Sequence, residues 1–255
     1  MSKWRCRRCP AALCAAVALL GVTAAAQQGA LSAVEIIRRA ILAHGGEAFR
    51  RPQTLELCGH ATYYPRDGGP AIEIERLRIA RVIPQESRRA RAPNGKVLVE
   101  AWSGGQLFFR EGFDGARAWS QLSAQARPIA EYLQLDRHFG FGVIRFAETP
   151  GFRLERLPDG EVAGRPVYRV AITDVEGRTT QFAIDRASWL IHKVEFDTPL
   201  GHHERIYWPY DARDRIKEAR HVRLIFAGHK LFDVWWEEVR YNQPLPDQMF
   251  AAPSK

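Results

Sequence analysis

The sequence predicts a mainly β (α+β) protein, in which one strongly bent antiparallel sheet carries two helices against its concave side. Three observations lead to this prediction. From Thr54 onward, segments rich in Val, Ile, Tyr, Phe and Trp recur every six to twelve residues or so, as is typical of short strands. Short glycine-containing turns separate these segments. In the second half of the chain the segments alternate apolar and polar residues, which indicates a sheet with one apolar and one wet face.

The first 26 residues have the three zones of a secretory signal peptide. A basic head is followed by an apolar run at residues 11–22, too short to cross a bilayer as a helix, and then by small residues. The basic residues of the head are Lys3, Arg5, Arg7 and Arg8. We expect cleavage between Ala26 and Gln27, which leaves residues 27–255 as a single domain without a transmembrane segment. An uncleaved N-terminal anchor is the alternative.

Removal of this segment weakens two clues that the whole chain suggests. The segment holds four of the 37 basic residues and none of the 29 acidic ones, so 33 basic and 29 acidic residues remain, a net charge of +4. No basic cluster stands out, and a nucleic-acid partner is therefore not expected. Three of the four cysteines also leave, and only Cys58 remains. A buried, unreactive thiol is expected there, with a reactive cysteine as the alternative.

Two helices are predicted. Ser32 and Glu35 have the spacing of a capping box, and Gly45-Gly46 gives a left-handed stop. Between them the apolar residues at helical spacing are Val34, Ile37, Ile41 and Leu42. A short turn at residues 47–49 is expected to follow. The second helix is expected at residues 128–139, which begin with proline and precede Gly140; an irregular loop is the alternative.

Glycine-containing turns predict hairpins between consecutive strands. They are Asp67-Gly68-Gly69, Asn94-Gly95, Gly104-Gly105, Asp114-Gly115, Asp159-Gly160, Glu176-Gly177 and Ala227-Gly228. We therefore expect an antiparallel meander in which neighbouring strands pair in order. In residues 72–82 the apolar positions change phase, because Ile72 and Ile74 are even whereas Leu77 and Ile79 are odd. A β-bulge near Glu75 and Arg76 would restore a single apolar face.

Alternation predicts which side chains share the apolar face of the second half. The sets are Tyr168, Val170 and Ile172; Thr180, Phe182 and Ile184; Leu190, Val194 and Phe196; Ile206, Trp208 and Tyr210; and Val222, Leu224 and Phe226. In residues 232–239, Trp235 and Trp236 place aromatic side chains on both faces of one strand. This strand is either covered on two sides or borders a pocket for an apolar ligand.

Motifs for catalysis are absent from the sequence. It has no Gly-x-Ser-x-Gly elbow, no His-Glu-x-x-His and no phosphate-binding loop. His202 and His203 are adjacent on a predicted strand, so their rings point to opposite faces and cannot share an ion. His60, His192, His221 and His229 lie on separate strands, where ordinary surface or core histidines are expected rather than a metal site. We expect no enzyme activity, no catalytic residue, no metal and no cofactor.

The order of several short segments resembles the outer-membrane lipoprotein-sorting family, the periplasmic carriers of the LolA/LolB type and their relatives. The segments are residues 43–46, 113–119, 164–170, 182–190 with the pattern Asp185, Ser188 and Leu190, and 239–250 with Asn242, Pro244, Asp247 and Phe250. The resemblance implies a half-open barrel whose helices lie in its mouth, a periplasmic location, and a hollow that takes acyl chains. The chain departs from the membrane-anchored members because it has no lipid-anchor cysteine.

The function that we expect is that of a soluble periplasmic binding or carrier protein, which shelters a lipid, a lipoprotein acyl chain or another apolar ligand without catalysis. Its partner would be that ligand or an envelope lipoprotein. The alternative is an envelope sensor or structural interaction protein with a filled interior. The residues expected to line the apolar cavity are Tyr168, Val170, Ile172, Phe182, Ile184, Val194, Phe196, Ile206, Trp208, Leu224, Phe226 and Trp236.

Overall fold

The sheet that alternation predicts is present in the computed structural model, which describes residues 31–83, 95–122, 141–211 and 215–253. The chain divides into Met1–Ser32 and Ala33–Lys255, and every described helix and strand belongs to the second unit. The expected signal segment, the helix expected at residues 128–139 and Asn94 of one expected turn lie outside the described residues. They stay predictions.

Twelve antiparallel strands form one sheet in the order β5-β4-β3-β2-β1-β12-β11-β10-β9-β8-β7-β6. The strands are β1 Thr54–Tyr63, β2 Ile72–Val82, β3 Lys96–Ser103, β4 Gln106–Phe113, β5 Ala118–Leu122, β6 Arg153–Val162, β7 Arg165–Thr173, β8 Thr179–Asp185, β9 Ile191–Thr198, β10 Gly201–Tyr210, β11 Ala219–Phe226 and β12 His229–Tyr241. Consecutive strands pair as predicted, except that β5 and β6 lie at the two edges. Pairing of β1 with β12 joins strands β1–β5 to strands β6–β12, and the sheet stays open because β5 and β6 do not pair.

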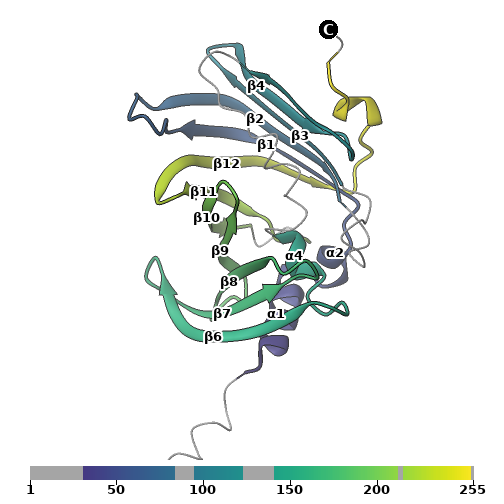
Figure 1. The fold of residues 1–255 in the computed structure, drawn as a ribbon, viewed down its shortest axis with the longest axis vertical. Helices are drawn as coiled ribbons and strands as arrows, with labels where there is room; N and C mark the ends of the chain where they lie inside the picture. The colour runs from purple at the N-terminus through teal and green to yellow at the C-terminus, as the bar shows by residue number, and fades with distance from the viewer. Residues whose placement is uncertain (1–30, 84–94, 123–140, 212–214, 254–255) are drawn as a thin grey trace, which may run out of the picture. The chain divides into compact units, whose positions relative to one another are not determined.

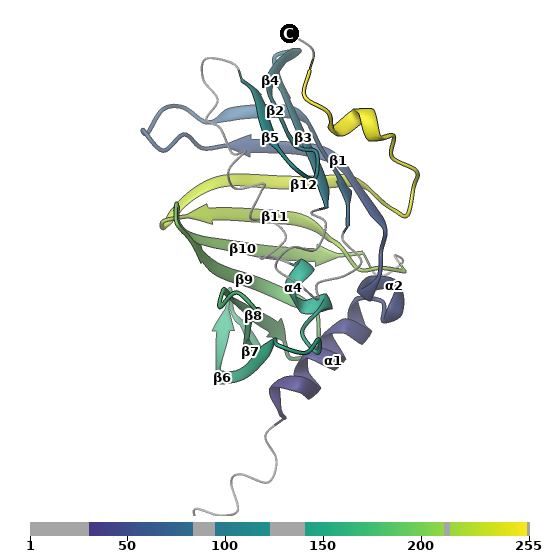
Figure 2. The same ribbon diagram turned by 45° about the vertical axis from the view of Figure 1, so that its right-hand side comes forward.

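In the described part of the chain, three α-helices and a 3-10 helix accompany the sheet: α1 Ala33–His44, α2 Glu47–Arg50, α4 Phe141–Arg145 and η2 Asp247–Phe250. Figures 1 and 2 show the sheet curving around α1 and α4, whereas η2 lies outside β3 and β4. The N-terminal helix, the turn after it and the bent sheet are thus confirmed. The described mid-chain helix is α4, which begins directly after Gly140.

The buried stripe of α1 differs from the predicted one. Its members are Ala33, Ile36, Ile37, Ala40, Ile41 and His44. Leu42 is 74% exposed, so its assignment to this stripe was wrong. The spacing of three, one, three, one and three residues follows the 3.6-residue period, and the small Ala40 lets the helix approach the sheet closely. Arg38 and Arg50 both bind Glu148, which ties α1 and α2 to the segment behind α4.

Register shows which side chains share a face, since residues opposite each other in an antiparallel pair point the same way. Val170 lies opposite Phe182, and Phe182 lies opposite Val194. We call the face that carries these residues the concave face and the opposite one the convex face. Phe141 of α4 packs against Tyr207 of the concave face at a ring distance of 4.8 Å. The helices therefore lie on the concave side of the sheet, near one end of its strands.

The β-bulge predicted in β2 is confirmed. Gly59 lies opposite Leu77 and Ala61 opposite Ile74, so Glu75 and Arg76 together face a single residue of β1. Gly59 also allows a close approach on its other side, because a Cβ there would lie 1.8 Å from the carbonyl oxygen of Trp235. Glu75 is then turned toward the β3–β4 turn, where its carboxylate accepts hydrogen bonds from the amides of Gly104 and Gly105.

One predicted turn was wrong. Asp159-Gly160 lies inside β6, where the register shifts between Leu157 and Gly160 and a bulge results. The chain turns instead at Ala163 and Gly164, which have φ values of +48° and +77°. A two-residue hairpin of this kind requires positive φ at both central positions, and this is the pair of residues that adopts it.

The predicted face of β10 was also wrong. Arg205 lies opposite Val194 and His203 opposite Phe196, so the odd positions of β10 lie on the concave face. Ile206 and Trp208 lie on the convex face, opposite Lys193 and His221. The register of the β9–β10 hairpin explains the error: Thr198 pairs with Gly201, so even positions of β9 lie opposite odd positions of β10. In β9 itself Ile191 rather than Leu190 lies opposite Ile184, so Leu190 also leaves the predicted set.

Candidate functional site on the concave face

The concave face brings together most of the residues predicted to line an apolar cavity. Register places Tyr168, Val170, Ile172, Phe182, Ile184, Val194, Phe196, Leu224, Phe226 and Trp236 on this face. Ile206 and Trp208 lie on the opposite face and leave the set. The role of the remaining residues as a lining stays a prediction.

The two ends of the concave face differ in chemistry. At the hairpin end, away from the helices, the side chains are aromatic and aliphatic: Tyr63 contacts Phe232 at a ring distance of 4.9 Å and Phe108 at 5.9 Å. Tyr63, Leu224 and Phe232 are only half-buried, although they belong to the inner side of the sheet. Apolar surface that is not packed away is the material from which a binding site for an apolar ligand is made.

The helix end of the same face is polar. The hydroxyl of Tyr241 donates a 2.6 Å hydrogen bond to Glu218, and Arg145 of α4 hydrogen-bonds to Tyr241. Burial raises the pKa of both Glu218 and Tyr241, and it lowers the pKa of Arg145. Arg81 of β2 adds a further positive charge that acts on Glu218 and Arg145. These side chains come from β2, α4, β12 and the segment before β11.

His44 anchors this end. Its Nδ1 donates to the carbonyl oxygen of Lys217 at 2.9 Å, and its Nε2 accepts the amide hydrogen of Ile191 at 3.0 Å. The imidazole is fully buried, stacks on Phe49 at 4.7 Å and is therefore held neutral, so that burial lowers its pKa to about 4. Because Lys217 precedes Glu218, this histidine positions the carboxylate of the polar end.

Arg205 and Tyr207 lie between the two ends. Burial lowers the pKa of Arg205 and raises that of Tyr207. The guanidinium of Arg205 lies over the ring of Phe196, at 5.3 Å from its centroid. His203 lies two residues before Arg205 on the same face of β10. Its ring stacks on Phe196 at 5.0 Å between centroids, and burial lowers its pKa to about 4. His202 points to the convex face toward Asp197, which confirms the predicted separation of these histidines.

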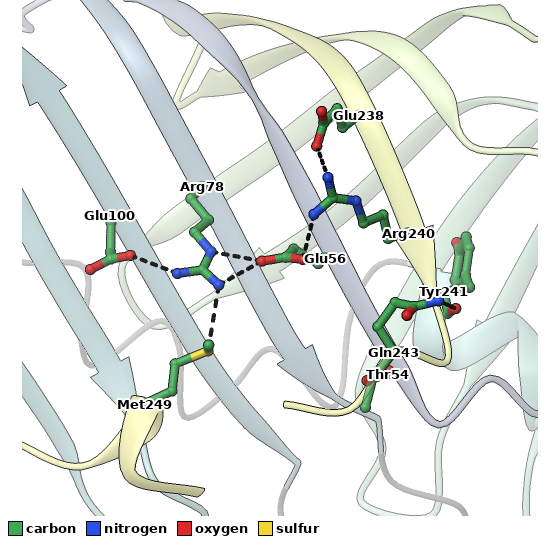
Figure 3. Close-up of polar contacts among 9 residues, drawn as sticks. All are labelled: Thr54, Glu56, Arg78, Glu100, Glu238, Arg240, Tyr241, Gln243 and Met249. Carbon is green, nitrogen blue, oxygen red and sulfur yellow. Dashed lines mark hydrogen bonds and ion pairs between the residues drawn. The ribbon is translucent and has the colours of Figure 1, made fainter. Parts of the chain in front are cut away.

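The convex face is closed by ion pairs and by the C-terminal segment. Figure 3 shows Arg78 between Glu56 and Glu100, with 2.6 Å to the former and 3.5 Å to the latter. Arg240 approaches Glu56 from β12 at 3.5 Å. Residues 243–253 continue over this face, where Phe250 packs with Ala80 and Leu98. The C-terminal segment thus covers the convex face of β2–β5, whereas Trp235 on the convex face of β12 is 42% exposed. We take the concave face, which carries the helices and the predicted lining, as the candidate site.

Cys58 also lies on the convex face, opposite Arg78 and Glu238. It is half-buried rather than fully buried. Burial, together with the charge of Glu56, raises the pKa of the thiol, which favours its protonated form. The expected full burial of Cys58 was therefore wrong, and its lack of reactivity stays a prediction.

Sequence reasoning missed the polar end. Arg145, Glu218 and Tyr241 lie far apart in the chain, and no motif connects them. The only signal was indirect, because Tyr241 belongs to the closing run that resembles the lipoprotein-sorting family. Among the described residues no group of three or more His, Cys, Asp or Glu side chains is arranged to hold a metal ion. In the same part of the chain no helix is long and apolar enough to cross a membrane.

No family model matches the chain, and no curated protein matches its sequence significantly. Solved structures, in contrast, match its fold. A DUF1329 family protein from Desulfovibrio piger superposes with a TM-score of 0.56 at 11% identity, over 85% of this chain and 95% of its own. A LolA superfamily protein from Nitrosomonas europaea superposes with a TM-score of 0.51 at 13% identity, over 88% and 99%. The chain therefore has a LolA/LolB-like fold.

Proposed function

We propose that this protein is a periplasmic carrier that shelters a lipid, a lipoprotein acyl chain or a similar apolar ligand on its concave face, without catalysing a reaction. The half-buried apolar side chains at the hairpin end, Tyr63, Leu224 and Phe232, are the observation that carries this proposal. A structural protein would gain stability by packing such residues fully, at roughly 25 cal/mol for each Å² removed from water. Their exposure on the inner side favours a surface that a ligand completes.

The LolA/LolB-like fold supports the same proposal. It pairs a curved sheet with helices that lie on its inner side, and the strand order here is open at β5 and β6. An open sheet gives a long apolar chain a way to the concave face without unfolding of the core. The expected signal peptide would deliver the protein to the periplasm, where cleavage after Ala26 would give an N-terminus at Gln27.

Native purification tests the proposal. The protein is purified from the envelope without detergent and analysed by native mass spectrometry, followed by organic extraction. We expect a stoichiometric lipid mass that extraction removes, and an N-terminus at Gln27. Clean apoprotein that also fails to bind fluorescent fatty-acid probes would contradict the carrier function. That result would favour the alternative function, an envelope sensor or structural interaction protein with a filled interior.

A further inference from the structure

Arg145 is a buried cation that forms no ion pair with a described carboxylate. The residue is 9% exposed, and its guanidinium lies over the ring of Phe49, 4.8 Å from the centroid. Nε has no hydrogen-bond partner, and among the described residues Arg145 forms no ion pair. Burial of an unpaired charge costs free energy unless something compensates it, and native proteins rarely leave such groups without a reason.

The surroundings compensate this charge only in part. Glu218 attracts Arg145 electrostatically but forms no ion pair with it, because the Glu218 carboxylate accepts the 2.6 Å hydrogen bond of the Tyr241 hydroxyl. Register and contacts place Arg81, Arg145, Arg156 and Arg205 on the described part of the concave face, where the carboxylates near them include Glu111 and Glu218. Arg156 is paired with Asp159, so it does not contribute an unpaired charge. Positive charge therefore exceeds negative charge on an otherwise apolar surface.

The polar and apolar ends are set apart along the strands. In β12, Phe232 belongs to the hairpin end and Tyr241 to the helix end. At a rise of about 3.3 Å per residue these positions are roughly 30 Å apart. Figures 1 and 2 show the helices near one end of these strands only. A cationic end and an apolar end on one face match a molecule with an anionic head and a long apolar tail.

We propose that the concave face selects anionic amphiphiles, and that Arg145 pairs with the carboxylate or phosphate of the head group while the tail lies toward Phe232. The proposal rests on the carrier function, and it adds the class of ligand. Tyr241 orients Arg145 through its hydroxyl, and Phe49 holds the guanidinium plane. Arginine suits this task because its planar fork matches both carboxylate and phosphate oxygens.

The test compares ligands that share one tail. Dodecanoate, dodecyl phosphate and dodecan-1-ol are titrated into the delipidated protein by calorimetry, below their critical micelle concentrations. We expect both anions to bind at least about tenfold more tightly than the alcohol, the effect of one charge-assisted pair. Acetate and inorganic phosphate are expected to bind far more weakly than their dodecyl counterparts. Equally tight binding of the free anions would overturn the amphiphile as ligand.

Two variants are expected to change anion binding in opposite directions. Arg145→Gln is expected to abolish the preference for anions and to leave the affinity for dodecan-1-ol unchanged. Glu218→Gln removes the competing carboxylate but keeps a hydrogen-bond partner for Tyr241, and it is expected to tighten dodecanoate binding severalfold. Arg117→Gln, in the exposed β4–β5 turn, is the matched control and should behave as wild type. If Arg145→Gln does not fold, Arg145→Lys with a retained preference and Glu218→Gln carry the test.

The outcomes separate this inference from the carrier function. If wild type binds all three dodecyl ligands equally, the head-group site is overturned and the carrier function stands. If no dodecyl ligand binds to protein whose fold is verified by circular dichroism, the carrier function fails and the inference fails with it. A preference for anions that Arg145→Gln leaves intact would overturn the assignment to Arg145.

Discussion

His44 connects helix α1 to two separate segments of the sheet region, the start of β9 and the residues before β11. Both ring nitrogens are used, one as donor to Lys217 and one as acceptor from Ile191, and this arrangement is possible only for the neutral imidazole. The pKa of about 4 in the folded state compares with the ordinary 6.5. Between these pH values the unfolded chain binds a proton that the folded chain does not.

Stability is therefore expected to fall as the pH falls through this window. The contribution of His44 is fully present above pH 6.5, and about 2 kcal/mol of it is lost at pH 5. Urea unfolding of wild type and His44→Gln at pH 7.5 and pH 5 measures this loss. The free energy of unfolding is expected to differ less between the two pH values in the variant than in wild type. His229→Gln, at an exposed position in the β11–β12 hairpin, is the control. An unchanged pH difference in His44→Gln would contradict the prediction.

Arg145 adds a different lesson at the same scale. Its sequence neighbours form a short apolar helix, and nothing in residues 141–145 distinguishes a surface arginine from a buried one. Only the contact with Tyr241 and Phe49 shows that this cation lies inside the protein. Unpaired buried charges are therefore found by structure and not by pattern.

At the scale of elements, the segment after β12 acts as a cover for the convex face of β2–β5. Trp119 donates its indole hydrogen to the carbonyl oxygen of Phe250 at 2.8 Å, and Lys96 binds Asp247 at 2.7 Å. Gly112 makes room for this arrangement, because a Cβ there would lie 2.4 Å from the Trp119 ring. Gly112 of β4, Trp119 of β5 and Phe250 of η2 thus pack together on the convex face.

Truncation of Phe250 is expected to destabilise the protein strongly. Phe250 is fully buried, so Phe250→Ala should lower the free energy of unfolding by about 3–5 kcal/mol. Trp119→Phe keeps most of the packing but leaves the Phe250 carbonyl without its donor, and a loss of about 1–2 kcal/mol is expected. Urea unfolding measures both. Gln248→Ala, in the exposed part of η2, is the control. If Phe250→Ala lost no more stability than this control, the segment would not cover the face.

For the whole molecule, the separation of the two sheet faces organises function. Trp235 and Trp236 are adjacent in β12, yet Trp235 lies on the convex face with 42% exposure and Trp236 on the concave face with 6%. Trp235 stacks on His221 at 4.0 Å, and Trp236 lies opposite Gly59. The expectation that aromatics occupy both faces is confirmed, but the strand is not covered on both sides.

Quenching of these two tryptophans should report which face holds the ligand. A doxyl-labelled fatty acid is expected to quench the protein fluorescence, and Trp236→Phe should remove a substantial part of the quenched signal. Trp235→Phe is the matched control, because it changes the same side chain one residue away on the opposite face. Loss of quenching in the Trp235 variant alone would place the ligand on the convex face and contradict the carrier proposal.

Local patterns predicted the parts of the fold that depend on a few neighbouring residues. The stop of α1 at Gly45-Gly46, the hairpin turns at Gly104-Gly105 and Ala227-Gly228, and the bulge at Glu75 and Arg76 all follow from residues next to one another. Asp185 and Ser188 belong here too: Asp185 Oδ1 accepts hydrogen bonds from the amides of Ala187 and Ser188 and from the Ser188 hydroxyl. The short pattern that resembles the lipoprotein-sorting family is therefore a self-contained turn.

The sequence by itself determined the class of the fold, its strands and its apolar face, because alternation and turn chemistry act over a few residues. Only the tertiary structure decided three other features: the pairing of β1 with β12, the face on which Arg205 and Tyr207 lie, and the meeting of Arg145, Glu218 and Tyr241. The face of a strand residue depends on the register with which the strand pairs, and the polar end of the site joins residues far apart in the chain. No local pattern records either of them.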